Sequence, residues 1–239
     1  MEQFAYLLFY RYSYVFMVLP VVIISMIIQA KMKSTYSKYA KVGNMRRITG
    51  AQAAQLVLEY YGIHDVQIRC VQGKLTDHYD PRTKVIALSP EVFNNPSIAA
   101  VGIACHEAGH AAQHAENYGP IKVRNLILPV CNVGSSLSFP LIIIGLLFFS
   151  GSSIGGTLVW AGILLYAFVA VFQLVTLPVE FNASNRALQV IENNGLLNYE
   201  EKTGAARVLR AAAMTYVAAL AVSLVQLLRL ILVFGRRNR

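Results

Sequence analysis

Residues 103–119, IACHEAGHAAQHAENYG, hold three of the five histidines in a chain of 239 residues. His106 and His110 stand four positions apart, close to one helical turn, so both imidazoles can face a single metal ion. Glu107 completes the pattern H-E-x-x-H. On a helix this pattern typically binds Zn²⁺ through the two histidines, while the glutamate moves a proton from the activated water to the leaving group. The competing interpretation is a helix whose histidines bond only to backbone or water.

A catalytic zinc needs a third protein ligand and an open fourth position. His114 lies eight residues from His106, a rise of about 12 Å along a straight helix, which is too far for the same ion. It is a candidate for a group beside the substrate or behind a ligand, or a plain amphipathic residue. Glu180 is the preferred third ligand because it follows an apolar segment directly, and a carboxylate at a bilayer edge is unfavourable unless paired or metal-bound. The competitors lie farther out among polar residues: Glu192, Glu200 and Glu201.

Four further residues are candidates for supporting roles. Ser184 and Asn185 follow Glu180 by about one turn and are placed to hold a ligand histidine by its second ring nitrogen. His78 and Tyr79, in LTDHYDPR, are candidates to stabilise the oxyanion, and the strand expected over 84–88 is a candidate edge for binding an extended peptide. An ordinary polar hairpin turn is the competing interpretation of this segment.

The composition indicates that membrane segments position these residues. The chain is 56% hydrophobic and 14% charged, whereas soluble domains are about 45–50% apolar and about 25% charged. Four segments have the length of about 20 apolar residues that a bilayer requires. They cover 12–30, 126–149, 154–177 and 211–234. The first segment lacks a small-residue cleavage site, so we expect an anchor rather than a cleaved signal.

These segments divide the chain into five expected regions. They are an N-terminal transmembrane anchor (1–30), a catalytic α+β region (31–125), a transmembrane hairpin (126–177), a helix carrying the third ligand (178–210), and a C-terminal transmembrane helix with a basic tail (211–239). The turn SGSS at 150–153 returns the chain to the side it left, so both polar regions share one face of the membrane. Lysines and arginines in these regions favour the cytoplasm, although the tail GRRNR argues the other way if the fourth segment spans.

The first polar region reads as helix, strand, strand, helix. Thr49 and Gln52 predict a capping box, and Gly62 predicts the end of the first helix. Strands are expected over 65–71 and 84–88. The H-E-x-x-H helix is expected to start from an asparagine cap with Pro96 in its first turn and to end at Gly119. Pro178 is expected in the first turn of a separate helix that carries Glu180.

The charge pattern and the cysteines argue against a nucleic-acid-binding protein and against a disulfide-stabilised protein. The net charge is +9, but no stretch interleaves basic and aromatic residues, so we expect no nucleic-acid partner. The three cysteines are scattered and include no C-x-x-C, so we expect no disulfide framework.

Four motifs together resemble the neutral zinc metallopeptidase family of membrane proteins, the YugP-like proteins. They are CHEAGHAAQHAENY, LTDHYDPRTKVIALSP, LPVEFNASNRAL and AAAMTYVAALA, and the resemblance covers nearly the whole chain. More distantly the chain resembles the HtpX-like and CAAX-prenyl-protease gluzincins. The resemblance implies one Zn²⁺ per chain held by His106, His110 and Glu180, with Glu107 as the general base. The distant relatives carry an aspartate four residues after the ligand glutamate, where this chain has Ser184.

The sequence therefore predicts a mainly α membrane protein with about four transmembrane helices and a small α+β zincin-like catalytic region. The expected activity is zinc-dependent endopeptidase cleavage of membrane proteins or peptides at the lipid bilayer, on the cytoplasmic side of the cell membrane. A site-two-type intramembrane protease would need an aspartate in a later membrane segment, and 126–177 and 211–234 contain none. A non-enzymatic scaffold with a structural zinc would usually need four cysteine or histidine ligands. The sequence leaves the natural substrate and the oligomeric state open.

Overall fold

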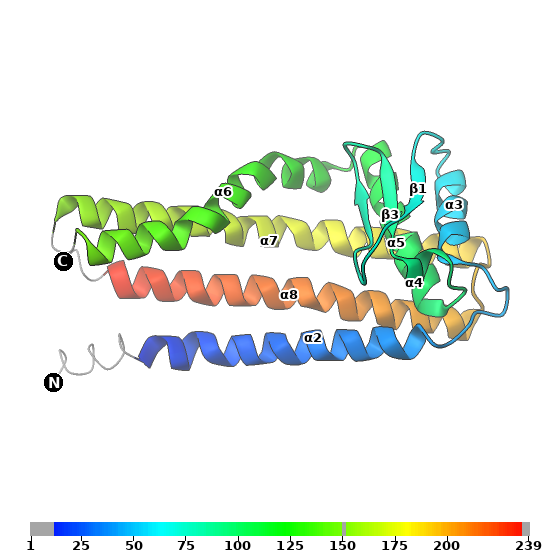
Figure 1. Ribbon diagram of the computed structural model, residues 1–239, viewed down its shortest axis with the longest axis horizontal. Coiled ribbons are helices and arrows are strands. Elements are labelled where there is room, and N and C mark those ends of the chain that lie inside the picture. Colours follow the sequence, from blue (N-terminus) through cyan, green and yellow to red (C-terminus); the bar gives the residue numbers. More distant parts are fainter. Residues whose placement is uncertain (1–11, 150–151, 236–239) are drawn as a thin grey trace. The chain divides into compact units, whose positions relative to one another are not determined.

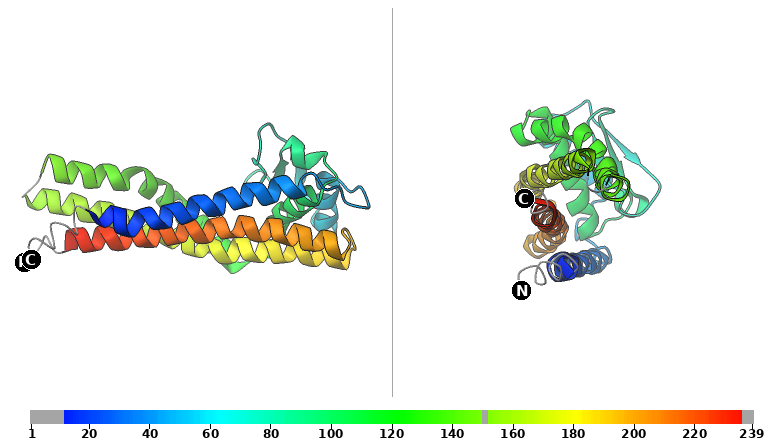
Figure 2. Two further views of the ribbon diagram at one scale, coloured as in Figure 1. Left: turned by 90° about the horizontal axis from the view of Figure 1, so that it is seen from below. Right: turned by 90° about the vertical axis from the view of Figure 1, so that its left-hand side faces the viewer.

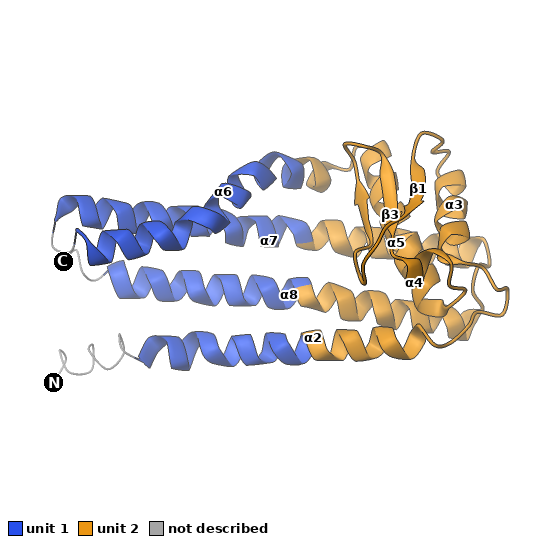
Figure 3. Cartoon of the chain, viewed as in Figure 1, with its two compact units in different colours: residues 1–28, 123–176, 216–239 blue, residues 29–122, 177–215 orange. Residues whose placement is uncertain are grey.

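Helices make up most of the chain in the computed structural model, which describes residues 12–149 and 152–235 (Figure 1). The elements are η1 (Tyr14–Val18), α2 (Leu19–Tyr39), α3 (Gly50–Tyr60), β1 (Gln67–Cys70), β2 (His78–Asp80), β3 (Val85–Leu88), α4 (Pro90–Phe93), α5 (Ile98–Ala115), α6 (Gly119–Leu147), α7 (Ser153–Asn193) and α8 (Tyr199–Gly235). They form two compact units (Figure 3). Unit 1 comprises 1–28, 123–176 and 216–239, and unit 2 comprises 29–122 and 177–215.

Within the described residues, four helices are long and apolar enough to cross a membrane, as the sequence predicted. They are Tyr14–Tyr39, Gly119–Leu147, Ser153–Asn193 and Tyr199–Gly235. In unit 1, α6 and α7 lie side by side (Figure 2), and small residues allow the contact. A Cβ added at Gly134 would lie 2.7 Å from the Leu165 carbonyl oxygen, and one at Gly162 would lie 2.6 Å from the Ser138 carbonyl oxygen. The glycines and serines of this segment thus permit the close helix packing expected of membrane helices.

Unit 2 holds a three-stranded sheet in the order β1-β3-β2. β1 pairs with β3 in parallel, and β2 pairs with β3 antiparallel. The prediction that strand 84–88 forms an edge is therefore wrong, because β3 is the central strand and β2 is an edge. Strand β2 escaped prediction because its three residues, HYD, are too few to show the alternation that marks a strand.

Helix α3 follows its sequence signals. Thr49 and Gln52 form the predicted capping box, with the Thr49 hydroxyl accepting from the Gln52 backbone N–H. Gly62 takes a φ of +64° just beyond the helix, where a residue without a Cβ is favoured. Alanines 53 and 54 of α3 are fully buried in the core that α3 shares with α5. This packing fixes the helix that carries H-E-x-x-H.

Helix α5 is shorter at both ends than predicted. Its N-cap is Ser97, whose hydroxyl accepts from the Ala100 backbone N–H at 3.2 Å, so Pro96 lies before the helix and not in its first turn. It ends at Ala115, and Asn117 with a φ of +57° takes the left-handed position expected of Gly119, which instead begins α6. Asparagine accepts this conformation more readily than other non-glycine residues, which explains the earlier end.

Helix α7 runs unbroken for 41 residues, so the separate helix predicted to start near Pro178 is wrong. Pro178 lies inside α7, where its missing N–H leaves one carbonyl of the preceding turn without its helical donor. The expected region 178–210 is likewise two pieces, the end of α7 and the beginning of α8. Glu180 is thus carried on the same helix as the apolar segment 154–177.

Candidate metal centre

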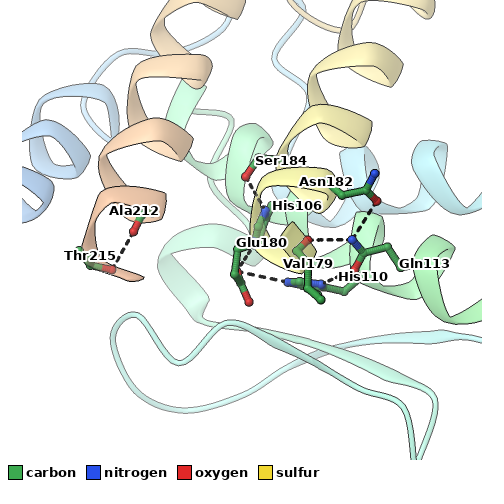
Figure 4. Close-up of polar contacts among 9 residues, drawn as sticks. All are labelled: His106, His110, Gln113, Val179, Glu180, Asn182, Ser184, Ala212 and Thr215. Carbon is green, nitrogen blue, oxygen red and sulfur yellow. Dashed lines mark hydrogen bonds and ion pairs between the residues drawn. The ribbon is translucent and has the colours of Figure 1, made fainter. Parts of the chain in front are cut away.

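His106, His110 and Glu180 lie together in unit 2 (Figure 4). One ligand atom from each falls within 4.8 Å of the other two. The Glu180 Oε2 atom lies 3.3 Å from Nε2 of His106 and 3.6 Å from Nε2 of His110. The two imidazole rings meet edge to face, with centroids 4.7 Å apart. The structure therefore brings together the three residues expected to be ligands, two from α5 and one from α7.

The spacing of these donors fits a tetrahedral zinc ion. Zinc bonds of about 2.0–2.2 Å at the tetrahedral angle place neighbouring donor atoms about 3.4 Å apart. The separations of the Glu180 oxygen from the two histidine nitrogens, 3.3 Å and 3.6 Å, lie close to that value. All three side chains are largely shielded from solvent, and the Glu180 side chain is only 4% exposed. Two imidazoles and a carboxylate are also a donor set that zinc accepts in catalytic sites.

Gly109, inside the H-E-x-x-H motif, allows α5 to approach α7 closely. A Cβ at this position would lie 2.7 Å from the backbone carbonyl oxygen of Ala183. That distance is shorter than real Cβ contacts, so any larger residue would force the helices apart. Because Ala183 lies three residues after Glu180, the same contact sets the separation between the histidines and the carboxylate.

Ser184 lies behind His106. Its Oγ is 3.1 Å from Nδ1 of His106, so the nitrogen that faces away from Glu180 has a hydrogen-bond partner. Such a contact orients a ligand ring and selects the nitrogen left for the metal. Asn185, the other candidate for this position, is exposed and does not take it. Of the two candidates, Ser184 therefore supports His106.

His110 has a partner that the sequence analysis missed. Gln113 is fully buried, and its Oε1 lies 3.0 Å from Nδ1 of His110. Its Nε2 donates to the Val179 carbonyl at 2.8 Å and to Oδ1 of Asn182 at 2.9 Å (Figure 4). The available signal was the spacing, because residues three apart on a helix are neighbours, and Gln113 follows His110 by three.

Glu107 is buried, with 9% of its surface exposed. Burial by itself lowers the pKa of His110, but its contact with Glu180 and the charges of Glu107 and Glu180 outweigh burial and raise that pKa above its ordinary value. Glu107 thus lies near enough to act on His110 electrostatically. Its burial and its nearness to His110 make Glu107 a candidate for a general base.

Tyr79 and His114 contact each other beyond the cluster, across β2 and α5. The Tyr79 hydroxyl lies 3.3 Å from Nδ1 of His114. Burial, with the nearby charges of Asp65 and Asp80, raises the pKa of Tyr79 to about 12, so the hydroxyl keeps its proton at neutral pH. His114 is not part of the three-donor cluster, as the helical rise predicted.

The remaining candidates lie elsewhere. His78 is exposed, and its Nδ1 lies 2.7 Å from the Thr76 carbonyl oxygen. Glu192 pairs with Lys202 at 2.6 Å, and Glu201 accepts from the backbone N–H groups of Met45 and Asn198. Glu200 is exposed in the first turn of α8. None of the three competing glutamates joins the described cluster.

Comparison with known proteins agrees with this geometry. Residues 14–235 match the model of a family described as "Putative neutral zinc metallopeptidase". The chain belongs to this family. A relative from Bacillus subtilis (strain 168), named "Putative membrane protease YugP", is 43% identical over 222 residues, which cover 92% of this chain and 96% of the relative. No solved structure matches the chain. The resemblance drawn from the four motifs is confirmed.

Proposed function

We propose that the protein is a membrane-embedded zinc endopeptidase that cleaves membrane-associated proteins or peptides. The observation that carries the proposal is the cluster of His106, His110 and Glu180 with the buried Glu107 beside it. Membership in a zinc metallopeptidase family and the similarity to a relative named as a membrane protease support it.

Each residue of the cluster has a distinct task in this proposal. Nε2 of His106, Nε2 of His110 and a carboxylate oxygen of Glu180 would hold the zinc, which would supply a Lewis acid to acidify water and polarise a carbonyl. The Glu107 carboxylate accepts the proton of the attacking water and delivers it to the leaving nitrogen. Its burial places that transfer away from bulk solvent.

Strand β2 is the proposed binding edge for an extended peptide. It lies at one edge of the sheet, antiparallel to β3, and its Tyr79 contacts His114 on α5. A peptide that pairs with the free side of β2 would gain main-chain hydrogen bonds and run beside the helix of the metal centre. The protonated Tyr79 hydroxyl is a donor available to a substrate carbonyl or oxyanion.

The proposed site faces the cytoplasm at the end of the membrane segments. Glu180 follows the apolar stretch 154–177 within three residues on the same helix. Residues 31–122 of the first polar region and the whole of the second, 178–210, belong to unit 2, which supports the proposal that the two regions share one membrane face. That unit also carries a run of basic residues directly after the first apolar segment, the pattern that favours the cytoplasmic side. These residues are Lys31, Lys33, Lys38, Lys41, Arg46 and Arg47.

A Glu107→Gln variant tests the proposal. Zinc content and hydrolysis of an unfolded fluorescent casein would be measured on detergent-purified wild type, Glu107→Gln and the control Glu200→Gln, which alters an exposed glutamate. We expect zinc to remain in all three, and hydrolysis to fall only in Glu107→Gln, by about 10²–10⁴-fold. Zinc binding with equal hydrolysis in wild type and Glu107→Gln would contradict the role of Glu107. Zinc binding without hydrolysis in any form, across membrane-protein substrates as well, would favour the non-enzymatic scaffold.

A further inference from the structure

The hydrogen bonds around Gln113 determine which ring nitrogen of His110 carries a proton. The side-chain amide of Gln113 lies between α5 and α7, fully buried, and each of its polar atoms has a partner. One atom faces the Val179 carbonyl oxygen at 2.8 Å. A carbonyl oxygen only accepts, so the Gln113 atom that faces it must be the amide nitrogen.

This assignment fixes the other end of the amide. The Gln113 atom that lies 3.0 Å from Nδ1 of His110 must then be the carbonyl oxygen, which also only accepts. The hydrogen of that bond must come from Nδ1 of His110. His110 Nε2, the atom that faces Glu180, is left to supply its lone pair to a metal.

Arg186 fixes the same direction independently. Its Nε donates to Oδ1 of Asn182 at 2.8 Å, and a guanidinium has no acceptor, so this Asn182 atom must be the oxygen. The same oxygen accepts from Gln113 Nε2 at 2.9 Å. Reversing the Gln113 amide would therefore place its oxygen against two acceptors, the Val179 carbonyl and Asn182 Oδ1.

Arg186 is itself held in place from two further elements. Its guanidinium pairs with Glu116, at the end of α5, at 2.7 Å. It also stacks over the Tyr61 ring, at the end of α3, with the guanidinium carbon 5.6 Å from the ring centroid. The hydrogen-bond chain from Arg186 through Asn182 and Gln113 to His110 thus begins at a cation that three elements position.

The partner of His106 lacks this directionality. Ser184 Oγ can donate or accept, so its contact with Nδ1 of His106 orients the ring without dictating the tautomer. The hydrogen bonds that run from Arg186 therefore fix the tautomer of one histidine of the pair, His110.

We propose that Gln113 is a positioning residue that holds a proton on Nδ1 of His110 and reserves Nε2 for the metal, and that Arg186 orients Gln113 through Asn182. The proposal rests on the proposed function only in that zinc binds at this centre. Removing such a partner typically lowers metal affinity by about 10–100-fold.

The test compares Gln113→Met and Arg186→Met with the controls Gln189→Met and Arg210→Met, which alter exposed residues of α7 and α8. Two quantities are measured on each detergent-purified full chain. One is the zinc dissociation constant from competition with a chelating dye. The other is the ¹⁵N histidine spectrum of the metal-free protein at pH 8, with the His110 signal identified by its loss in His110→Asn.

We expect a slowly exchanging N–H at Nδ1 of His110 in wild type and both controls, and its loss in Gln113→Met. Zinc affinity should fall by about 10–100-fold in Gln113→Met. It should fall by a smaller factor in Arg186→Met, because the Val179 carbonyl still orients Gln113 there. The controls should bind zinc as wild type does.

Two results overturn the proposal. An unprotonated Nδ1 in wild type would show that Gln113 does not direct the proton. Unchanged zinc affinity in Gln113→Met, even with a lower melting temperature, would show that Gln113 only fills the core. Unchanged zinc affinity in Arg186→Met would show that Arg186 does not orient Gln113. If wild type binds no zinc, the proposed peptidase fails, while the spectrum of the metal-free protein still decides the proton on His110.

Discussion

Gly109→Ala is expected to damage the metal centre without touching a ligand. The new Cβ would lie 2.7 Å from the Ala183 carbonyl oxygen, whereas ordinary contacts begin at 3.4 Å, so α5 and α7 must separate by about 0.7 Å. Metal–ligand distances tolerate deviations of only about 0.2 Å. His106 and His110 on one helix and Glu180 on the other therefore lose a common coordination position.

Stability responds less than zinc binding in this variant. Overpacking of this kind destabilises by about 1–3 kcal/mol. Replacing a helical glycine by alanine contributes about 1 kcal/mol in the opposite direction. The net loss of folding free energy is therefore about 0–2 kcal/mol, so most of the protein should remain folded while zinc affinity falls by about tenfold or more.

Zinc affinity, measured by competition with a chelating dye, is the assay, with Gly119→Ala as the matched control. A Cβ at Gly119 meets nothing within 4 Å, so this variant should bind zinc as wild type does. The reasoning is refuted if Gly109→Ala binds zinc within twofold of wild type. That result would show that the helix contact at Gly109 does not set the ligand separation.

Two further substitutions probe the support of the site and of the fold. Ser184→Ala removes the hydroxyl 3.1 Å from Nδ1 of His106 and should lower zinc affinity by about tenfold. The control is Ser135→Ala, which removes a hydroxyl that donates to the Asn132 carbonyl, and equal zinc affinities in the two variants would contradict an orienting role for Ser184. Gly62→Ala places a Cβ at a φ of +64° and should destabilise the protein by about 1 kcal/mol in thermal unfolding. Zinc affinity should not change. An unchanged or higher melting temperature would contradict this account of the end of α3.

The three donors of the cluster were predictable because their chemistry leaves a local signal in the sequence. His106, Glu107 and His110 lie within one helical turn, and Glu180 is a carboxylate at the end of an apolar run. The rise of the helix alone separated His114 from the metal position. Local signals also defined α3, through the capping box at Thr49 and the glycine at 62.

The parts that escaped prediction depend on tertiary contacts. Gln113 has no pattern of its own, and its importance arises from Val179 and Asn182, which are more than 60 residues away in the chain. Pro178 is typical of the first turn of a helix, but the structure places it inside α7, and the sequence around it does not show that the helix continues. Strand β2 exists because β3 supplies its hydrogen bonds, and a segment of three residues is too short to carry a signal of that pairing.

Zinc content per chain in wild type and Glu180→Ala, purified side by side, tests the central claim most directly. The account predicts about one zinc in wild type and a clear loss in the variant, because Glu180 supplies the only carboxylate of the described three-donor cluster. Retention of zinc by Glu180→Ala would contradict the assignment of the third ligand. Absence of zinc from wild type under metal-replete conditions would contradict the metallopeptidase itself.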